Sequence, residues 1–163
     1  MARHEADRED LMREATALSP RIELALPGRA QRLVAGSRSG GRLSLYFGAD
    51  PVYHFDSAGR LGRAYCAGSL YRSQGTTVAR LTRHRTPQET RLQRHDLNAL
   101  ELDEFLRAMR RHMAELRETL DAGTVRIVQQ VPPEAVFLPI LKAAVAAILA
   151  ADPPLAPAVI GRS

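Results

Sequence analysis

Arginine is the residue type whose spacing most strongly suggests chemistry in this chain. Between Ser57 and His95 lie eight arginines and a single acid, Glu89, so this stretch carries a formal charge of +7, whereas the whole chain carries only +5. The planar guanidinium group donates paired hydrogen bonds that match phosphate and carboxylate groups. Such a local excess of positive charge predicts an anionic partner, and RNA or DNA is the polyanion that we expect first. The eight residues are Arg60, Arg63, Arg72, Arg80, Arg83, Arg85, Arg91 and Arg94.

Alternation of apolar and polar residues predicts which of these cations share a surface. In the segment Arg42–Phe47, for example, every second residue is Leu or Phe, and similar alternation recurs further along the chain. If the leucines point into the core, one outer face of a sheet gathers cations, three histidines and a tyrosine that can stack on a base. A polar face that is merely solvated is the alternative. The predicted polyanion-binding residues are Arg42, Tyr46, His54, Arg80, His84, Arg91 and His95.

Residues that carry out catalysis or bind metals form no recognisable motif. Cys66 is the only cysteine, which excludes an intrachain disulfide and a cysteine-based metal cluster. The histidines lack metal-ligand spacing, and the surrounding arginines would repel a dication. His54 and Asp56 share a face as a base and its orienting acid would, but no nucleophile motif accompanies them. We therefore predict no catalytic residue, no metal and no cofactor.

The periodicity of the chain predicts the elements that position these residues. Residues 6–18 form a short amphipathic helix that ends before Pro20. From Arg21 to Leu97 the period is two and turn residues recur every few positions, which predicts an antiparallel meander of about six to eight strands. The glycine-rich stretch Ala35–Gly41 is predicted to be a hairpin loop.

One predicted hairpin resembles a known repeat. The residues Tyr53–Leu61, YHFDSAGRL, resemble a single YD-type (RHS) repeat unit, whose pattern is aromatic-x-aromatic-Asp-x-x-Gly-Arg-Leu. The resemblance covers under a tenth of the chain and occurs once. It implies a turn formed by Asp56 and Gly59 between aromatic residues, and it implies no function.

After Leu97 the chain is predicted to be helical again. Residues 98–122 form an amphipathic helix with a capping box at Asn98 and Glu101 and a closing Gly123. Residues 124–131 form another strand. Residues 134–151 form a helix that is apolar nearly all round, with Lys142 as its only charge after Glu134, and that is too short to span a membrane. Such a helix is either buried against the sheet or part of a homodimer interface.

These observations predict an α+β fold: an antiparallel meander packed on one face by the long helix and the apolar C-terminal helix, with a short N-terminal helix. The expected units are the N-terminal helix at 1–20, one domain at 21–151, and a disordered proline-rich tail at 152–163. The charged start, MARHEADRED, predicts a cytoplasmic protein without a membrane partner.

We expect a non-enzymatic binding domain for RNA, DNA or another polyanion. Two alternatives stay open at this point. One is a homo-oligomeric scaffold or adaptor that assembles through the C-terminal helix. The other is a small-ligand enzyme with a pocket lined by His54, Asp56 and Tyr46.

Overall fold

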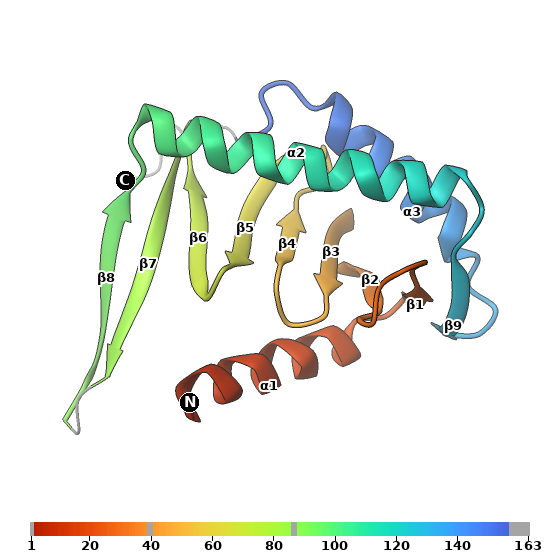
Figure 1. The fold of residues 1–163 in the computed structure, drawn as a ribbon, viewed down its shortest axis with the longest axis horizontal. Coiled ribbons are helices and arrows are strands. Elements are labelled where there is room, and N and C mark those ends of the chain that lie inside the picture. The colour runs from red at the N-terminus through yellow and green to blue at the C-terminus, as the bar shows by residue number, and fades with distance from the viewer. Residues whose placement is uncertain (1, 39–40, 86–87, 157–163) are drawn as a thin grey trace.

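The molecule has three helices and a single sheet in the described part of the chain (Figure 1). The computed structural model describes residues 2–38, 41–85 and 88–156, and their side chains except at residues 2–7, 83–85 and 90. The predicted α+β fold with an antiparallel meander is confirmed. In chain order the elements are α1 (Ala2–Ala17), β1 (Arg21–Ala25), β2 (Leu33–Arg38), β3 (Arg42–Phe47), β4 (Val52–Phe55), β5 (Leu61–Cys66), β6 (Ser69–Gln74), β7 (Thr77–Arg85), β8 (Thr90–Asp96), α2 (Ala99–Asp121), β9 (Arg126–Val131) and α3 (Phe137–Ala150).

The sheet follows the order of the chain. Its strand order is β8-β7-β6-β5-β4-β3-β2-β1-β9, and all neighbouring strands pair in antiparallel fashion. Turns connect each strand from β1 to β8 with the next strand in the chain, as the recurring turn residues require. The strand β9 returns after α2 and adds to the free edge of β1, so that β8 and β9 form the two edges of the sheet.

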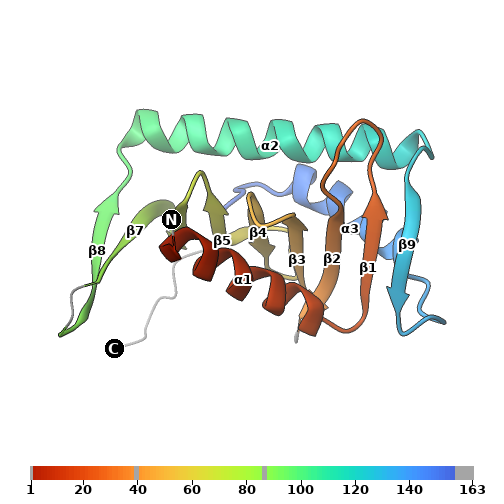
Figure 2. The same ribbon diagram turned by 60° about the horizontal axis from the view of Figure 1, so that its bottom comes forward.

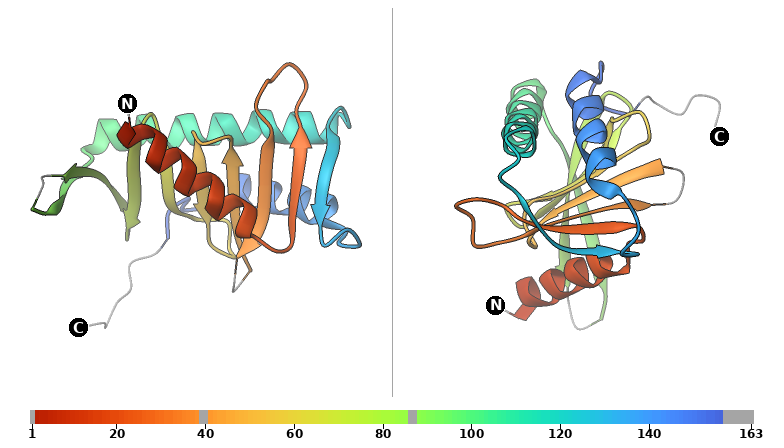
Figure 3. Two further views of the ribbon diagram at one scale, coloured as in Figure 1. Left: turned by 90° about the horizontal axis from the view of Figure 1, so that it is seen from below. Right: turned by 90° about the vertical axis from the view of Figure 1, so that its right-hand side faces the viewer.

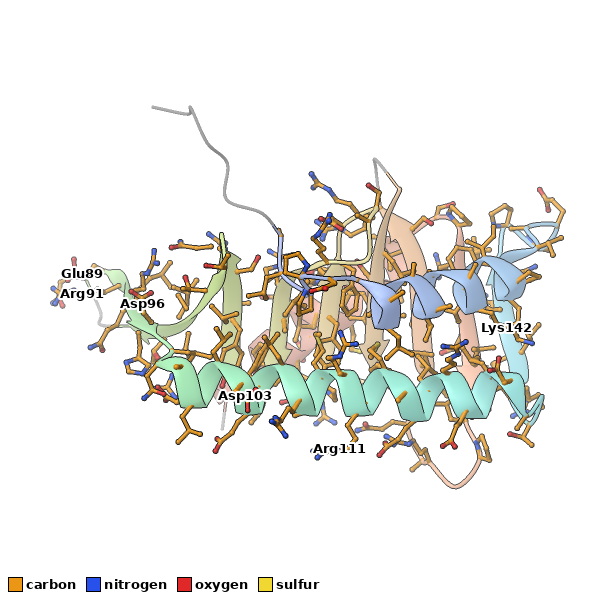
Figure 4. All side chains as sticks on the ribbon, turned by 90° about the horizontal axis from the view of Figure 1, so that it is seen from above. Glu89, Arg91, Asp96, Asp103, Arg111 and Lys142 are labelled. Carbon is orange, nitrogen blue, oxygen red and sulfur yellow. The ribbon has the colours of Figure 1, made fainter. Side chains whose placement is uncertain are left out.

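Helices α2 and α3 lie together on one face of the sheet (Figures 3 and 4). The predicted inward residues Leu43, Leu45 and Phe47 are buried there. Helix α2 contributes Met109 and Met113 to this core. Helix α3 buries about one residue per turn, on its side that faces the sheet. The apolar C-terminal helix is therefore in part a core helix. The residues that α3 buries are Phe137, Leu141, Val145 and Ile148.

Helix α1 covers part of the opposite face, which was not predicted to carry a helix (Figure 2). Its apolar stripe Leu11, Ala15 and Leu18 packs on a small second core formed by Val34, Tyr46 and Val52, with Tyr65 at its margin. The glycine of β2 explains the close approach. A Cβ at Gly36 would lie 2.7 Å from the Cβ of Leu18, so Gly36 belongs to a strand beneath a helix and not to the predicted hairpin loop.

Two local predictions are confirmed in atomic detail. The Asn98 side chain accepts a hydrogen bond from the Glu101 backbone N–H at 2.9 Å, and the Glu101 carboxylate accepts one from the Asn98 N–H at 3.0 Å. In the turn between β4 and β5, the Asp56 carboxylate accepts hydrogen bonds from the N–H groups of Ala58 and Arg60. Gly59 has a positive φ of 81°, as the turn requires.

The first residues of the predicted tail contact β5. Leu155 is buried and pairs with Leu61 of β5, because Pro154 and Ala156 exchange backbone hydrogen bonds with that residue. Residues 157–163 lie outside the described residues. None of the helices in the described part of the chain is both long enough and apolar enough to cross a membrane.

Gly59 provides a test of how the β4–β5 turn packs on α3. A Cβ at this position would lie 2.9 Å from the backbone of Ala147, whereas Gly123 has a similar φ of 70° and open space around it. We expect Gly123→Ala to lower the free energy of unfolding by about 1–2 kcal/mol through backbone strain alone. Gly59→Ala should cost about 1–3 kcal/mol more, because α3 must move. Equal losses in urea unfolding would show that the turn does not contact α3.

Candidate anion-binding site

The strand register separates the predicted polyanion-binding residues onto two faces. Cross-strand partners in an antiparallel sheet point to the same side, and Arg80 pairs with His95 in the row that contains the core residue Leu45. These two residues therefore share the α2 side of the sheet, whereas Tyr46 and His54 point to the α1 side. The prediction of a single basic face is wrong. The row runs through Leu45, Tyr53, Ala64, Tyr71, Arg80 and His95.

Tyr46 does not point outward as predicted. Only 1% of the residue is exposed, because α1 packs over it. Its hydroxyl donates a hydrogen bond to the Glu14 carboxylate at 3.4 Å. Burial is the main cause that raises the pKa of Tyr46 to about 12, and the negative charge of Glu14 adds to it. The ring therefore offers no face on which a base can stack.

The other predicted residues are scattered. Arg42 is exposed at the start of β3. Arg91 pairs with Glu89 at 2.7 Å at the outer end of the β7–β8 hairpin (Figure 4). His95 lies 3.6 Å from the Glu101 carboxylate at the start of α2. The side chain of His84 lies outside the described residues.

Four arginines gather instead around His54 on the α1 side of the sheet. We name Arg38, Arg42, Arg63 and Arg72 the arginine cluster. Arg63 pairs with His54 on one side and with Arg72 on the other, and Arg38 pairs with Arg42. Among the described residues no carboxylate lies within ion-pair distance of any of the four. Glu14 approaches them, but it accepts its hydrogen bond from Tyr46.

The register places like charges directly opposite each other twice within this cluster. Arg38 opposes Arg42, and Arg63 opposes Arg72. Opposed like charges destabilise a sheet, by amounts similar to the 0.2–1 kcal/mol or so that a favourable cross-strand pair contributes. An anion bound between the guanidinium groups would remove this repulsion. The two opposed pairs are therefore positions at which a bound anion would offset an unfavourable interaction of the free protein.

His54 is the buried centre of the site. Only 7% of it is exposed, and its Nδ1 atom lies 2.8 Å from the Ser44 Oγ and 3.2 Å from the Arg38 Nη1. Arginine can only donate, so Nδ1 accepts and the neutral ring carries its proton on Nε2. Burial, followed by the charges of Arg63 and Arg38, lowers the pKa of His54 to about 3. His54 is therefore an uncharged hydrogen-bonding residue of the cluster.

The geometry also disfavours catalysis by the side chains that could act as a nucleophile or a general base. Ser44 is fully buried beneath α1, and the basic nitrogen of His54 is already occupied. Asp56 holds the β4–β5 turn and does not orient His54. Burial raises the pKa of the Cys66 thiol to about 11, which suppresses the nucleophilic thiolate. No group of His, Cys, Asp or Glu within the described ranges is placed to hold a metal ion.

A groove of about 390 Å³ adjoins the arginine cluster. His54 and Arg63 form its polar end, and Asp10 and Glu14 of α1 line one wall. Its floor lies on β5, β6, β7 and β8, and α1 leaves β7 and β8 uncovered (Figures 1 and 2). We name it the leucine groove after its apolar lining, which consists of Leu11, Tyr65, Leu70, Leu81 and Leu92.

Comparison of the chain with protein-family models, curated proteins and solved structures found no match. The function must therefore follow from the site itself.

Sequence patterns located only part of this site. They predict Arg42 and His54 as site residues, place Arg63 and Arg72 only in the basic stretch, and do not point to Arg38. The missing signal is the register, because the pairing of Arg38 with Arg42 and of Arg63 with Arg72 depends on the turns between strands.

The lowered pKa of His54 predicts a specific loss of stability in acid. Its ordinary value is 6.5, and in the folded protein the value is about 3. Between these values the unfolded chain binds a proton that the folded protein does not. The free energy of unfolding should therefore fall as pH decreases through this window, by up to about 1.4 kcal/mol per pH unit.

The variant His54→Asn keeps an acceptor near the Nδ1 position but does not titrate. In urea unfolding across pH it should show a shallower slope than the wild type. Part of the slope should remain, because burial also lowers the pKa of His112. An unchanged slope would show that His54 is solvated in the folded state.

Proposed function

We propose that this protein is a non-enzymatic binding domain that holds anionic groups of a partner on the arginine cluster. The proposal is carried by two pairs of directly opposed arginines, Arg38 with Arg42 and Arg63 with Arg72. None of the four has an acid within ion-pair distance among the described residues. Guanidinium groups in this arrangement can donate several parallel hydrogen bonds to phosphate or carboxylate oxygens. RNA and DNA are the polyanions that the composition predicts, and they are the first ligands with which to test anion binding.

The environment of His54 supports binding rather than catalysis. Its neutral ring is fixed by Ser44 and Arg38, and the contact with Arg38 holds that guanidinium group in place within the arginine cluster. A rigid, preorganised cation loses less conformational freedom on binding than a mobile side chain does. The buried histidine therefore has a positioning role in the proposed site.

The proposal is tested with the variant Arg72→Glu. It replaces an opposed like-charge pair by an opposite-charge pair, so the free protein should become more stable by about 0.5 kcal/mol or more. Binding of a single-stranded oligonucleotide at low salt, measured by fluorescence anisotropy, should weaken about tenfold or more. The slope of log K against log salt should become shallower by about 0.7 for each phosphate that the variant no longer neutralises.

Arg111→Glu is the matched control, because it makes the same charge change on the exposed side of α2 (Figure 4). It should weaken oligonucleotide binding little at moderate salt. If both variants weaken binding equally, only net charge matters and the arginine cluster is not a site. If the wild-type protein binds no polyanion at low salt, the proposal fails outright.

A second candidate function, the homo-oligomeric scaffold, is supported by one observation on α3. Val136 before this helix and Ile140 in its first turns are 71% and 55% exposed, and exposed alanines continue the same stripe. A second copy of the chain is one partner that would cover this apolar surface.

This candidate predicts a dimer in sedimentation velocity and a monomer for Ile140→Glu. Lys142→Glu changes an exposed residue of the same helix and should leave the dimer intact. A monomeric wild-type protein at high concentration would remove the scaffold from consideration.

A further inference from the structure

The helical cover of the sheet is incomplete on the α1 side. On the opposite face α2 and α3 lie across the sheet together, whereas α1 crosses only its central strands and leaves β7 and β8 uncovered (Figures 2 and 3). The leucine groove lies on this uncovered part, next to α1. In the described part of the chain, no helix therefore covers β7 and β8 on this face.

The floor of the groove is apolar in a way that an ordinary solvent-facing sheet is not. Tyr65, Leu70 and Leu81 are cross-strand partners in one row on β5, β6 and β7. Leu92 continues the apolar surface on the edge strand β8, where it is 59% exposed. Four neighbouring strands thus present large apolar side chains to the same open groove, which marks a binding surface.

The charges around the groove specify the kind of segment that fits. Asp10 is already paired with Arg13 at 3.0 Å, and Glu14 accepts the hydrogen bond from Tyr46. Two charges in the described lining have no ion pair, Glu14 on the α1 wall and Arg63 on β5, and Arg72 lies directly opposite Arg63 on β6. The charges on the β5 and β6 side of the groove are therefore positive, and acidic groups of an occupant would pair with them there.

We propose that the leucine groove binds an acidic amphipathic helix of a partner protein, which lies beside α1 and completes the second helical layer. Leucine-like side chains of that helix, spaced at i, i+3, i+4 and i+7, occupy the apolar floor. Its Asp or Glu side chains pair with Arg63 and Arg72 at the polar end. This inference rests on the proposed function, because it identifies the anionic groups held by the arginine cluster as carboxylates of a polypeptide.

The floor favours a polypeptide over a nucleic acid. The lining holds four leucines and a single tyrosine ring, that of Tyr65, whereas bases stack on aromatic rings and Tyr46 is covered by α1. A mixed surface of leucines with cations at one end matches the apolar and acidic faces of a helix.

The experiment uses the full chain and three synthetic peptides of helical pattern. The first carries leucines at the spacing given above with glutamates beside them. In the second the leucines are replaced by serine, and in the third the glutamates are replaced by glutamine. Binding is measured by isothermal titration calorimetry. The first peptide should bind, and each of the other two should bind about tenfold more weakly or worse.

Two protein variants locate the peptide. Leu92→Asp changes an exposed residue of the groove, so the fold should tolerate it, and it should weaken the first peptide about tenfold or more. Leu100→Asp is the matched control, because Leu100 is a similarly exposed leucine on α2 outside the groove. It should leave peptide binding unchanged. Leu92→Asp should also leave binding of a single-stranded oligonucleotide to the arginine cluster largely intact.

Each contrary outcome overturns a distinct statement. If the serine peptide binds as tightly as the first, the groove takes no apolar side chains and only the proposed anion binding stands. If the glutamine peptide binds as tightly, the groove binds a helix but the acidic partner and the role of the arginine cluster fail. If only the oligonucleotide binds, the partner is a nucleic acid. If the protein is a dimer that Leu92→Asp dissociates, a second copy fills the groove.

Discussion

A large antiparallel sheet has two faces to keep from water, and this chain has enough helix to cover only one of them well. Helices α2 and α3 bury the leucines of one face in a continuous core. Helix α1 is the only element on the other face in the described part of the chain, and it covers that face in part. The position of α1 therefore decides which side chains of the second face are core, which are exposed and where a groove can form. Gly36 permits this position, because any Cβ there would collide with Leu18.

Burial on the same face explains the electrostatics of the candidate site. Ser44 and His54 are buried on the face that α1 partly covers, and burial together with the charges of Arg63 and Arg38 keeps the imidazole neutral. A neutral His54 can accept a hydrogen bond from Arg38, whereas a protonated ring would repel it. Two pairs of opposed arginines are then left at the margin of α1, where water solvates them in the free protein. The cluster thus depends on packing as much as on composition, and moving α1 would disrupt both the neutral histidine and the arginines around it.

Periodicity and turn residues correctly predict the helices and strands of this fold. They do not correctly predict which face of the sheet some of the side chains share. The strands from Arg21 to Asp96, the capping box at Asn98 and the turn at Asp56 each depend on local chemistry, and all are present. Alternation correctly separated Leu45 from Tyr46, but it does not tell which side a helix will cover. In β7 the apolar residue Leu81 suggested an inward face. It lines an open groove instead, so its neighbour Arg80 points to the α2 side.

This error has a physical meaning, because a binding surface made of leucines follows the same rule of alternation as a core does. The alternation in β7 and β8 predicts which apolar side chains are shielded from water. It does not predict whether the element that shields them belongs to the same chain or to a partner. Leu92 illustrates the point, since an edge strand usually carries charges that discourage pairing and association. Here Arg91, Gln93 and Arg94 provide polar neighbours while the leucine stays exposed. Its neighbour Leu81 on β7 pairs directly with Arg94, and Arg91 and Arg94 each pair with an acid, so the two leucines are the side chains of this region left for a partner to cover. The proposed helix would cover both of them.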